Sequence, residues 1–194
     1  MARSIEYNPQ EVLTKAMNLF WEKGYESTSV QDIVAVTGLK PGSLYSAYGN
    51  KEGIFKAVIE MYTVNSLKRV KDILEAEEDA LKNIENFLNL VIVEVISNAL
   101  HNGCLLVKTL LVISHKDEKI QEQIIEFYKQ LQPLVQKVLT EAKKQGQTHV
   151  EPNEFTSFIF STIYGTHVHY KTFRKKAILE QNVAFLMESL RKNS

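Results

Sequence analysis

The sequence predicts an all-α fold of about nine helices. Apolar residues recur at the three- and four-residue spacing of helices along most of the chain, and no segment alternates as a strand would. Gly, Pro or Asn also stands at the ends of several periodic segments, where such residues start or stop helices. The 194 residues are 44% hydrophobic and 24% charged, which suits a folded chain with one sizeable core or two smaller ones rather than a disordered chain.

The first helix is predicted to begin at Pro9, with Asn8 as its N-cap, and to close at Gly24. Its apolar stripe consists of Leu13, Ala16, Met17 and Phe20.

Residues 29–48 predict two short helices around a tight turn. Ser29 and Asp32 have the spacing of a capping box, and Gly38 suits the end of the first short helix. Pro41 suits the first position of the second. Leu44 and Tyr48 are expected to face inward, and Gly42, Ser43 and Tyr45 outward. This arrangement is typical of a DNA-binding helix-turn-helix.

The remainder of the chain predicts six more helices. A long one, capped by Asn50, begins at Lys51 and runs towards Lys71, so we expect it to link two domains. Five further apolar segments cover residues 81–100, 104–114, 120–146, 155–170 and 178–190. Pro133 is expected to kink the third of these.

A spaced pattern of glycine, hydroxyl and aromatic residues covers about the first third of the chain. It consists of Phe20, Gly24, Tyr25, Thr28, Gly38, Leu39, Gly42, Ser43, Leu44, Tyr45, Tyr48 and Lys51. With this pattern the chain resembles the TetR family of bacterial transcriptional regulators. The resemblance implies a helix-turn-helix DNA-binding domain at residues 6–66, with the motif at about 29–48. It also implies an effector-binding and dimerisation domain at residues 67–194.

The predicted DNA contacts follow from position around the second short helix. Side chains near its start reach base edges, while hydroxyls and lysines around it hold phosphates. The predicted DNA-binding residues are Thr28, Ser29, Lys40, Pro41, Gly42, Ser43, Tyr45, Tyr48 and Lys51. Tyr48, like Leu44, is better explained as a core residue. Lys40, Pro41 and Ser46-Ala47 depart from the family pattern, so the operator sequence cannot be carried over.

Charge distribution agrees with a local DNA-binding surface. The formal net charge is zero, which counts against a protein that coats nucleic acid along its whole surface. Residues 33–51 nevertheless hold two lysines and no acid. The five acids of residues 72–79 are expected to be solvated.

An effector pocket is implied between the DNA-binding domain and the last helices. Its candidate lining is the polar or aromatic residues set in apolar segments: His101, Cys104, Lys108, Phe127, Tyr128, Tyr164, His167 and Lys171. Individually, each is better explained as ordinary core or surface, but as a set they suggest a pocket with a few polar groups. His167 and His169 lie two apart on a helix and project in different directions, so no metal site is predicted. No cofactor is predicted either.

Cys104 carries an alternative signal-sensing hypothesis. As the only cysteine it has no intrachain disulfide partner, which agrees with a reducing compartment. It follows the Asn102-Gly103 break, so a helix N-terminus and Lys108 are expected to lower the pKa of its thiol. The preferred signal is a reversible apolar or aromatic ligand; the alternative is thiol-based sensing of electrophiles or oxidants through Cys104.

The last two helices are expected to form a homodimer interface, because their apolar faces are wide. The predicted interface residues are Phe155, Phe158, Ile159, Ile163, Leu179, Val183, Leu186 and Leu190. Packing of both faces within one chain is the alternative.

These features predict a sequence-specific DNA-binding transcriptional regulator in the cytoplasm, with no membrane partner. We expect a repressor that a small effector releases from a palindromic operator. A constitutive architectural DNA-binder is a less favoured alternative. An enzyme is not expected, because no nucleophile motif, metal motif or phosphate-binding loop is present.

Overall fold

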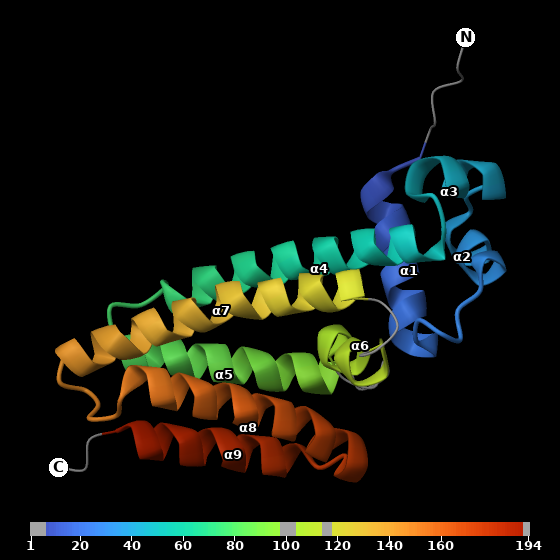
Figure 1. Ribbon diagram of the computed structural model, residues 1–194. Helices are drawn as coiled ribbons and strands as arrows, with labels where there is room; N and C mark the ends of the chain where they lie inside the picture. Colours follow the sequence, from blue (N-terminus) through green and yellow to red (C-terminus); the bar gives the residue numbers. More distant parts are fainter. Residues whose placement is uncertain (1–6, 98–103, 114–117, 192–194) are drawn as a thin grey trace.

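The computed structural model describes residues 7–97, 104–113 and 118–191. Within these residues it contains nine helices and no strand, which confirms the predicted class (Figure 1). The helices are α1 Pro9–Lys23, α2 Val30–Thr37, α3 Pro41–Tyr48, α4 Lys51–Leu74, α5 Ala80–Ser97, α6 Leu105–Ile113, α7 Glu118–Lys144, α8 Pro152–Phe173 and α9 Lys176–Leu190.

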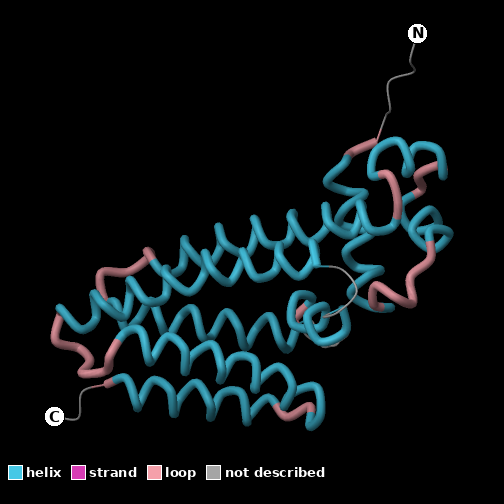
Figure 2. Tube along the Cα trace, in the orientation of Figure 1, coloured by secondary structure: helices cyan, strands magenta, loops and turns pink. Residues whose placement is uncertain are grey.

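The helices form two groups joined by α4. Figure 1 shows α1, α2 and α3 gathered at one end of the molecule, while α5, α7, α8 and α9 lie along one another in an elongated bundle. Helix α4 begins beside the first group and then runs next to α7 and α5. Short loops connect most of the helices, as the tube in Figure 2 shows. A movement of the bundle against α4 can therefore reach α1–α3 directly.

The predicted helix ends of the first group are confirmed. The Asn8 side chain accepts a hydrogen bond from the Gln10 N–H at 3.0 Å, capping α1. Ser29 and Asp32 form the reciprocal capping box of α2, with distances of 3.1 and 2.9 Å. Gly38 follows α2 with φ +73°, a conformation that glycine adopts without a Cβ clash.

Helices α3 and α4 meet at a very close contact. Pro41 occupies the first turn of α3, as predicted, and Asn50 caps α4 by accepting from the Gly53 N–H at 2.8 Å. A Cβ atom at position 53 would overlap the Tyr48 carbonyl oxygen at the end of α3. Only glycine fits there, so this residue sets how closely α3 approaches α4.

One hydrophobic core runs through both groups of helices. In the first group, Phe20 of α1 packs edge-on against Phe55 of α4, with ring centroids 4.7 Å apart. Ile33 of α2 and Leu44 of α3 are fully buried in the same cluster. The cluster continues along α4 into α5, α7 and α8, so the DNA-binding end and the bundle share a packed core.

Several boundaries differ from the predictions or lie outside the described residues. Helix α7 continues through Pro133 as a single helix, and the kink at this proline stays a prediction. His101 and the predicted break at residues 102–103 lie outside the described residues. The predicted domain boundary between residues 66 and 67 falls inside α4 and stays a prediction. In the described ranges, no helix has both the length and the hydropathy to cross a membrane.

Candidate DNA-binding surface and effector cavity

The outer face of α3 has the exposure that base contacts require. Leu44 is fully buried and Tyr48 half-buried, so these two side chains fasten α3 to the domain. On the opposite side, Gly42 is exposed and Tyr45 is 50% exposed, while Ser43 is half-buried. Lys40 and Pro41, at the start of the helix, are also exposed. The structure therefore brings five of the predicted DNA-binding residues, positions 40–43 and 45, together on one surface.

Thr28 and Ser29 are already engaged within the protein. The Thr28 side chain is buried and its Oγ1 donates to the Gly24 carbonyl oxygen at 2.7 Å. The prediction that its hydroxyl holds a phosphate is therefore wrong for this conformation. Ser29 uses its hydroxyl in the capping box and also donates to Asp32 at 2.8 Å. Sequence spacing identified the cap but did not reveal that capping occupies these groups.

Lys51 also makes an internal contact that the sequence did not indicate. Its Nζ donates to the Tyr25 carbonyl oxygen at 3.0 Å and lies 4.4 Å from the centroid of the Tyr25 ring. This ammonium fastens the start of α4 to the segment between α1 and α2. Any phosphate contact by Lys51 has to share the ammonium with Tyr25. Ser46 and Ala47, noted in the sequence only as departures from the family pattern, are exposed beside Tyr45.

A small cavity of about 60 Å³ lies among α4–α8, and we call it the inner cavity. Four predicted residues line it: Cys104, Phe127, Tyr128 and His167. The other lining residues are Tyr62, Ser66, Val70, Phe87, Leu90, Val91, Glu94, Leu106, Val107, Leu131, Phe160 and Ile163.

The remaining predicted pocket residues lie outside that lining. Tyr164 stands behind Tyr128, with ring centroids 5.4 Å apart and the rings nearly perpendicular. Lys171 is exposed. The Lys108 Nζ donates to the carbonyl oxygens of Trp21 at 2.7 Å and Glu22 at 3.5 Å, at the end of α1. Lys108 therefore connects α6 to the DNA-binding end instead of facing the cavity.

Glu94 places a carboxylate in the wall of the inner cavity, and it was not among the residues predicted from the sequence. Arg69 of α4 pairs with Glu94 of α5 at 2.7 Å. Burial raises the pKa of Glu94, although Arg69 and His167 act in the opposite direction. Burial lowers the pKa of His167, whose Nδ1 lies 2.8 Å from the Ile163 carbonyl oxygen and donates to it. A lone acid in the apolar segment LVIVEVIS was the available signal.

Burial also governs the hydroxyl and thiol groups around the cavity. It raises the pKa of Tyr62 well above the usual range, and it raises the pKa of Tyr164 to about 12. Cys104 lies just before α6, as expected, with its Sγ 3.7 Å from the Tyr62 hydroxyl. Burial raises the pKa of the Cys104 thiol despite the nearby backbone N–H groups. The expected lowering is therefore wrong, because desolvation outweighs those N–H groups and Lys108 points elsewhere.

The predicted dimer-interface residues largely lie on the opposite faces of their helices from those expected. Ile159, Ile163, Leu179, Leu186 and Leu190 are buried inside the protein itself. They pack α8 and α9 onto the bundle, which leaves little of their surface for a second copy. Among the predicted residues only Phe158 is exposed, while Phe155 and Val183 are half-buried.

The outer face of these two helices carries other large apolar residues. Val168 and Phe173 are exposed on α8, and Phe185 is exposed on α9. Within the described ranges, no group of three or more His, Cys, Asp or Glu side chains is placed to hold a metal ion.

Two family models together match most of the chain. Residues 12–58 match the model described as bacterial regulatory proteins, tetR family, and residues 80–186 match the tetracyclin repressor-like C-terminal domain. The chain belongs to the TetR family. Family membership makes this protein a DNA-binding transcription regulator rather than an enzyme, and it agrees with the helix-turn-helix of α2 and α3.

Curated relatives and solved structures agree with this family assignment. The transcriptional repressor ComR of Escherichia coli is 26% identical over 188 residues, covering 95% of this chain and 88% of ComR. The repressor DhaR of a Mycobacterium species is 22% identical, covering 93% and 91%. Reduced E. coli NemR superposes with a TM-score of 0.87 at 16% identity, covering 95% and 97%. A cysteine-substituted CifR complexed with operator DNA gives 0.84 at 22% identity, covering 96% and 99%.

Proposed function

We propose that this TetR-family regulator is a repressor that a small effector releases from a palindromic operator. The observation that carries the proposal is the path of α4. This single helix begins at Lys51, beside the DNA-binding face, and continues to Tyr62, Ser66 and Val70 in the wall of the inner cavity. A ligand that contacts the middle of α4 therefore acts on the element that positions α3.

Release follows from a difference in ligand affinity between two conformations. An effector that binds better to the conformation with misplaced recognition helices shifts the population towards it. Because Gly53 packs against the Tyr48 carbonyl oxygen and the Asn50 N–H donates to that oxygen at 2.9 Å, a tilt of α4 carries the recognition helix with it. A solid core would favour a constitutive architectural binder, whereas the cavity beside α4 favours ligand control.

A palindromic operator calls for two copies of the protein, and we place the second copy on the outer faces of α8 and α9. Phe158 and Val168 of α8 and Phe185 of α9 are large apolar side chains left in contact with water in the single chain. Large exposed apolar patches mark interaction surfaces. Pairing these faces through two-fold symmetry gives a four-helix interface and sets the distance between the two α3 helices.

A thiol signal is the second candidate, because Cys104 lines the inner cavity. Among the solved relatives, NemR is in a reduced form and CifR carries cysteine substitutions, which are facts about those proteins. The raised pKa of the Cys104 thiol counts against rapid reaction at neutral pH. Replacing Cys104 by Ser decides the matter: a thiol sensor loses its response to electrophiles, while a reversible-ligand regulator keeps its response to the ligand.

DNA binding is tested with Tyr45→Ala and Lys40→Ala on fluorescein-labelled DNA from the region upstream of the gene. Tyr45→Ala removes an exposed contact near the start of α3, so we expect reduced discrimination between operator and random DNA. Lys40→Ala removes a phosphate contact, so it should weaken binding to both DNAs and lower the salt slope by about one. Anisotropy titrations at two salt concentrations measure both effects.

Lys144→Ala on α7 is the matched control, since Lys144 is exposed and lies with Leu74 at the C-terminal end of α4, the end opposite to the DNA-binding face. It should bind like the parent. If both test variants also bind like the parent, α3 is not the reading helix.

A further inference from the structure

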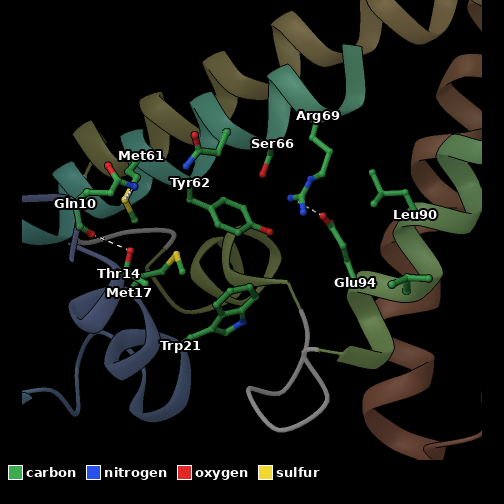
Figure 3. Close-up of a pocket in the computed structure, with 12 residues that line it drawn as sticks. Gln10, Thr14, Met17, Trp21, Met61, Tyr62, Ser66, Arg69, Leu90 and Glu94 are labelled. Carbon is green, nitrogen blue, oxygen red and sulfur yellow. Dashed lines mark hydrogen bonds and ion pairs between the residues drawn. The ribbon is translucent and has the colours of Figure 1, made fainter. Parts of the chain in front are cut away.

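A second and larger hollow lies between α1, α4 and α5, and we call it the outer cleft (Figure 3). Its volume is about 560 Å³. Its walls include Met17 and Trp21 of α1, Met61 and Asn65 of α4, and Leu90 and Val93 of α5. One wall thus belongs to the DNA-binding end of the molecule and another to the bundle.

The outer cleft and the inner cavity share a wall. Tyr62, Ser66, Leu90 and Glu94 line both of them. Sites for small molecules usually have volumes of roughly 300–1,000 Å³. The inner cavity, at about 60 Å³, holds only a few atoms, whereas the outer cleft has room for a whole ligand.

An unsatisfied hydroxyl indicates that the cleft accepts a polar atom. Ser66 is only 7% exposed, and its Oγ has no hydrogen-bond partner within the described residues. Figure 3 shows this hydroxyl directed into the cleft from α4. A buried hydroxyl without a partner destabilises the fold, and a ligand atom at hydrogen-bond distance offsets that cost.

The charges in the cleft favour an uncharged ligand. Arg69 and Glu94, its charged lining residues, already neutralise each other at 2.7 Å, as the dashed line in Figure 3 shows. An anion that took Arg69 would leave Glu94 partly buried without its partner, which is costly. A cation that took Glu94 would likewise displace Arg69.

The apolar part of the lining favours an aromatic body. The Trp21 ring packs edge-on against Tyr62, with centroids 5.6 Å apart. Met17 and Met61 add thioether sulfurs, which adapt to varied shapes and contact aromatic rings favourably. Flat rings stacked along Trp21 and the two methionines bury apolar surface without disturbing the ion pair.

We propose that the outer cleft is the main part of the effector site, and that it binds an uncharged aromatic molecule whose hydrogen-bonding group meets Ser66. This inference rests on the proposed ligand-responsive function. Occupation of the cleft acts on DNA binding through α1, since a ligand between Trp21 of α1 and Val93 of α5 sets their separation. At the rim, the Gln10 amide donates to the Met61 sulfur at 3.0 Å, so α1 and α4 move together.

Trp21 is the single tryptophan of the chain, so tryptophan fluorescence measures binding at the outer cleft directly. The probe is N-phenyl-1-naphthylamine, a neutral aromatic amine that accepts excitation energy from tryptophan and offers an N–H to the Ser66 oxygen. Its sulfonated analogue, 1-anilinonaphthalene-8-sulfonate, has the same rings and a negative charge. We expect the neutral probe to bind the full-length protein, quench Trp21, and bind at least about tenfold more tightly than the sulfonate, a difference of about 1.4 kcal/mol.

Two matched variants locate the probe. Val93 and Val64 are each 58% exposed, but only Val93 lines the outer cleft. Val93→Phe should fill the cleft and weaken the neutral probe about tenfold or more, while Val64→Phe should leave its affinity unchanged. Ser66→Ala should weaken it less, by about three- to tenfold, because one hydrogen bond is lost. Circular dichroism confirms that each variant is folded.

Operator binding by the same variants separates failure of this inference from failure of the proposed function. A parent protein that does not bind the operator contradicts the proposed function, whatever the probe does. Probe affinity that is equal in the parent and Val93→Phe, or no binding of either probe up to its solubility limit, overturns the cleft assignment alone. Tighter binding of the sulfonate overturns the uncharged class. Binding of the neutral probe should also weaken operator affinity in the parent and not in Val93→Phe.

Discussion

His167 and Glu94 both line the inner cavity, and burial shifts the pKa values of these two side chains in opposite directions. Burial lowers the pKa of the His167 imidazole, because the charged form is the one that loses water. Burial raises the pKa of the Glu94 carboxyl for the same reason, since its charged form is the deprotonated one. The two groups therefore make opposite contributions to the pH dependence of stability.

The His167 contribution can be isolated with His167→Gln. Its folded pKa lies below the usual 6.5, so at pH values above 6.5 the histidine is neutral in both the folded and the unfolded state. As pH falls below 6.5, the unfolded chain takes up a proton that the folded protein resists, and stability decreases until the folded pKa is reached. Urea unfolding between pH 7.5 and 5 should show a smaller loss for the variant than for the parent.

Glu94 has the opposite sign and serves as the control. Its folded pKa lies above the usual 4.5, so its burial opposes folding at neutral pH, and this cost is relieved as pH falls through the folded value. Glu94→Gln should therefore remove a stabilising effect of acid. A His167→Gln profile parallel to the parent's would show that the imidazole is not the group that titrates.

At the scale of the helices, the ends were easier to predict than the buried faces. Asn8, Ser29 and Gly38 act on backbone groups within a few residues, so their sequence context is sufficient to identify caps. Helices distant in the sequence decide which face of α8 and of α9 is buried. Because both helices have wide apolar faces, the sequence alone does not identify the buried one. The interface prediction consequently selected residues such as Leu179 and Leu186, which belong to the core.

The site was predicted in part for the same reason. Cys104, Phe127, Tyr128 and His167 stand out as polar or aromatic residues in apolar helices, and they do line the inner cavity. The outer cleft depends on how α1 lies against α5, two elements about 70 residues apart, which no local pattern reports.

Lys108 connects two helices that otherwise belong to different ends of the molecule. Its ammonium lies at the C-terminus of α1, where carbonyl oxygens lack helical partners and the helix dipole favours a positive charge. Lys108→Met keeps most of the stem and removes the charge. We expect a loss of about 1 kcal/mol in the free energy of unfolding.

The same change should weaken the coupling between α6 and the DNA-binding end. Hydrogen exchange should become faster at the last turn of α1 in Lys108→Met. Lys129→Met, an exposed lysine on α7, should leave both stability and exchange unchanged. Equal exchange in the two variants would mean that the contact does not hold α1.

At the scale of the whole molecule, the outer faces of α8 and α9 are the surface left for a second copy. Figure 1 shows these helices side by side at the edge of the bundle farthest from α4. A stable pair of chains usually buries about 800 Å² on each partner. The exposed phenylalanines at 158 and 185 supply large apolar anchors for such an interface.

Phe185→Glu should convert the proposed dimer to monomers. A carboxylate at this position would be desolvated without a partner in the interface, at a cost of several kcal/mol. Val64→Glu, on the exposed side of α4, introduces the same charge elsewhere and should leave the dimer intact. Sedimentation velocity distinguishes the two, and a dimer that survives in Phe185→Glu would place the interface on another face.

The close approach at Gly53 has a genetic consequence. Gly53→Ala would force α3 away from α4, because a Cβ there overlaps the Tyr48 carbonyl oxygen, yet it leaves α8 and α9 untouched. Such a chain would still pair through the bundle. In a cell that carries both alleles, mixed dimers contain one intact recognition helix and one displaced helix. The altered chains therefore hold normal chains in dimers that bind the operator poorly. Substitutions at this glycine should therefore be dominant, whereas those that disrupt the proposed interface should be recessive.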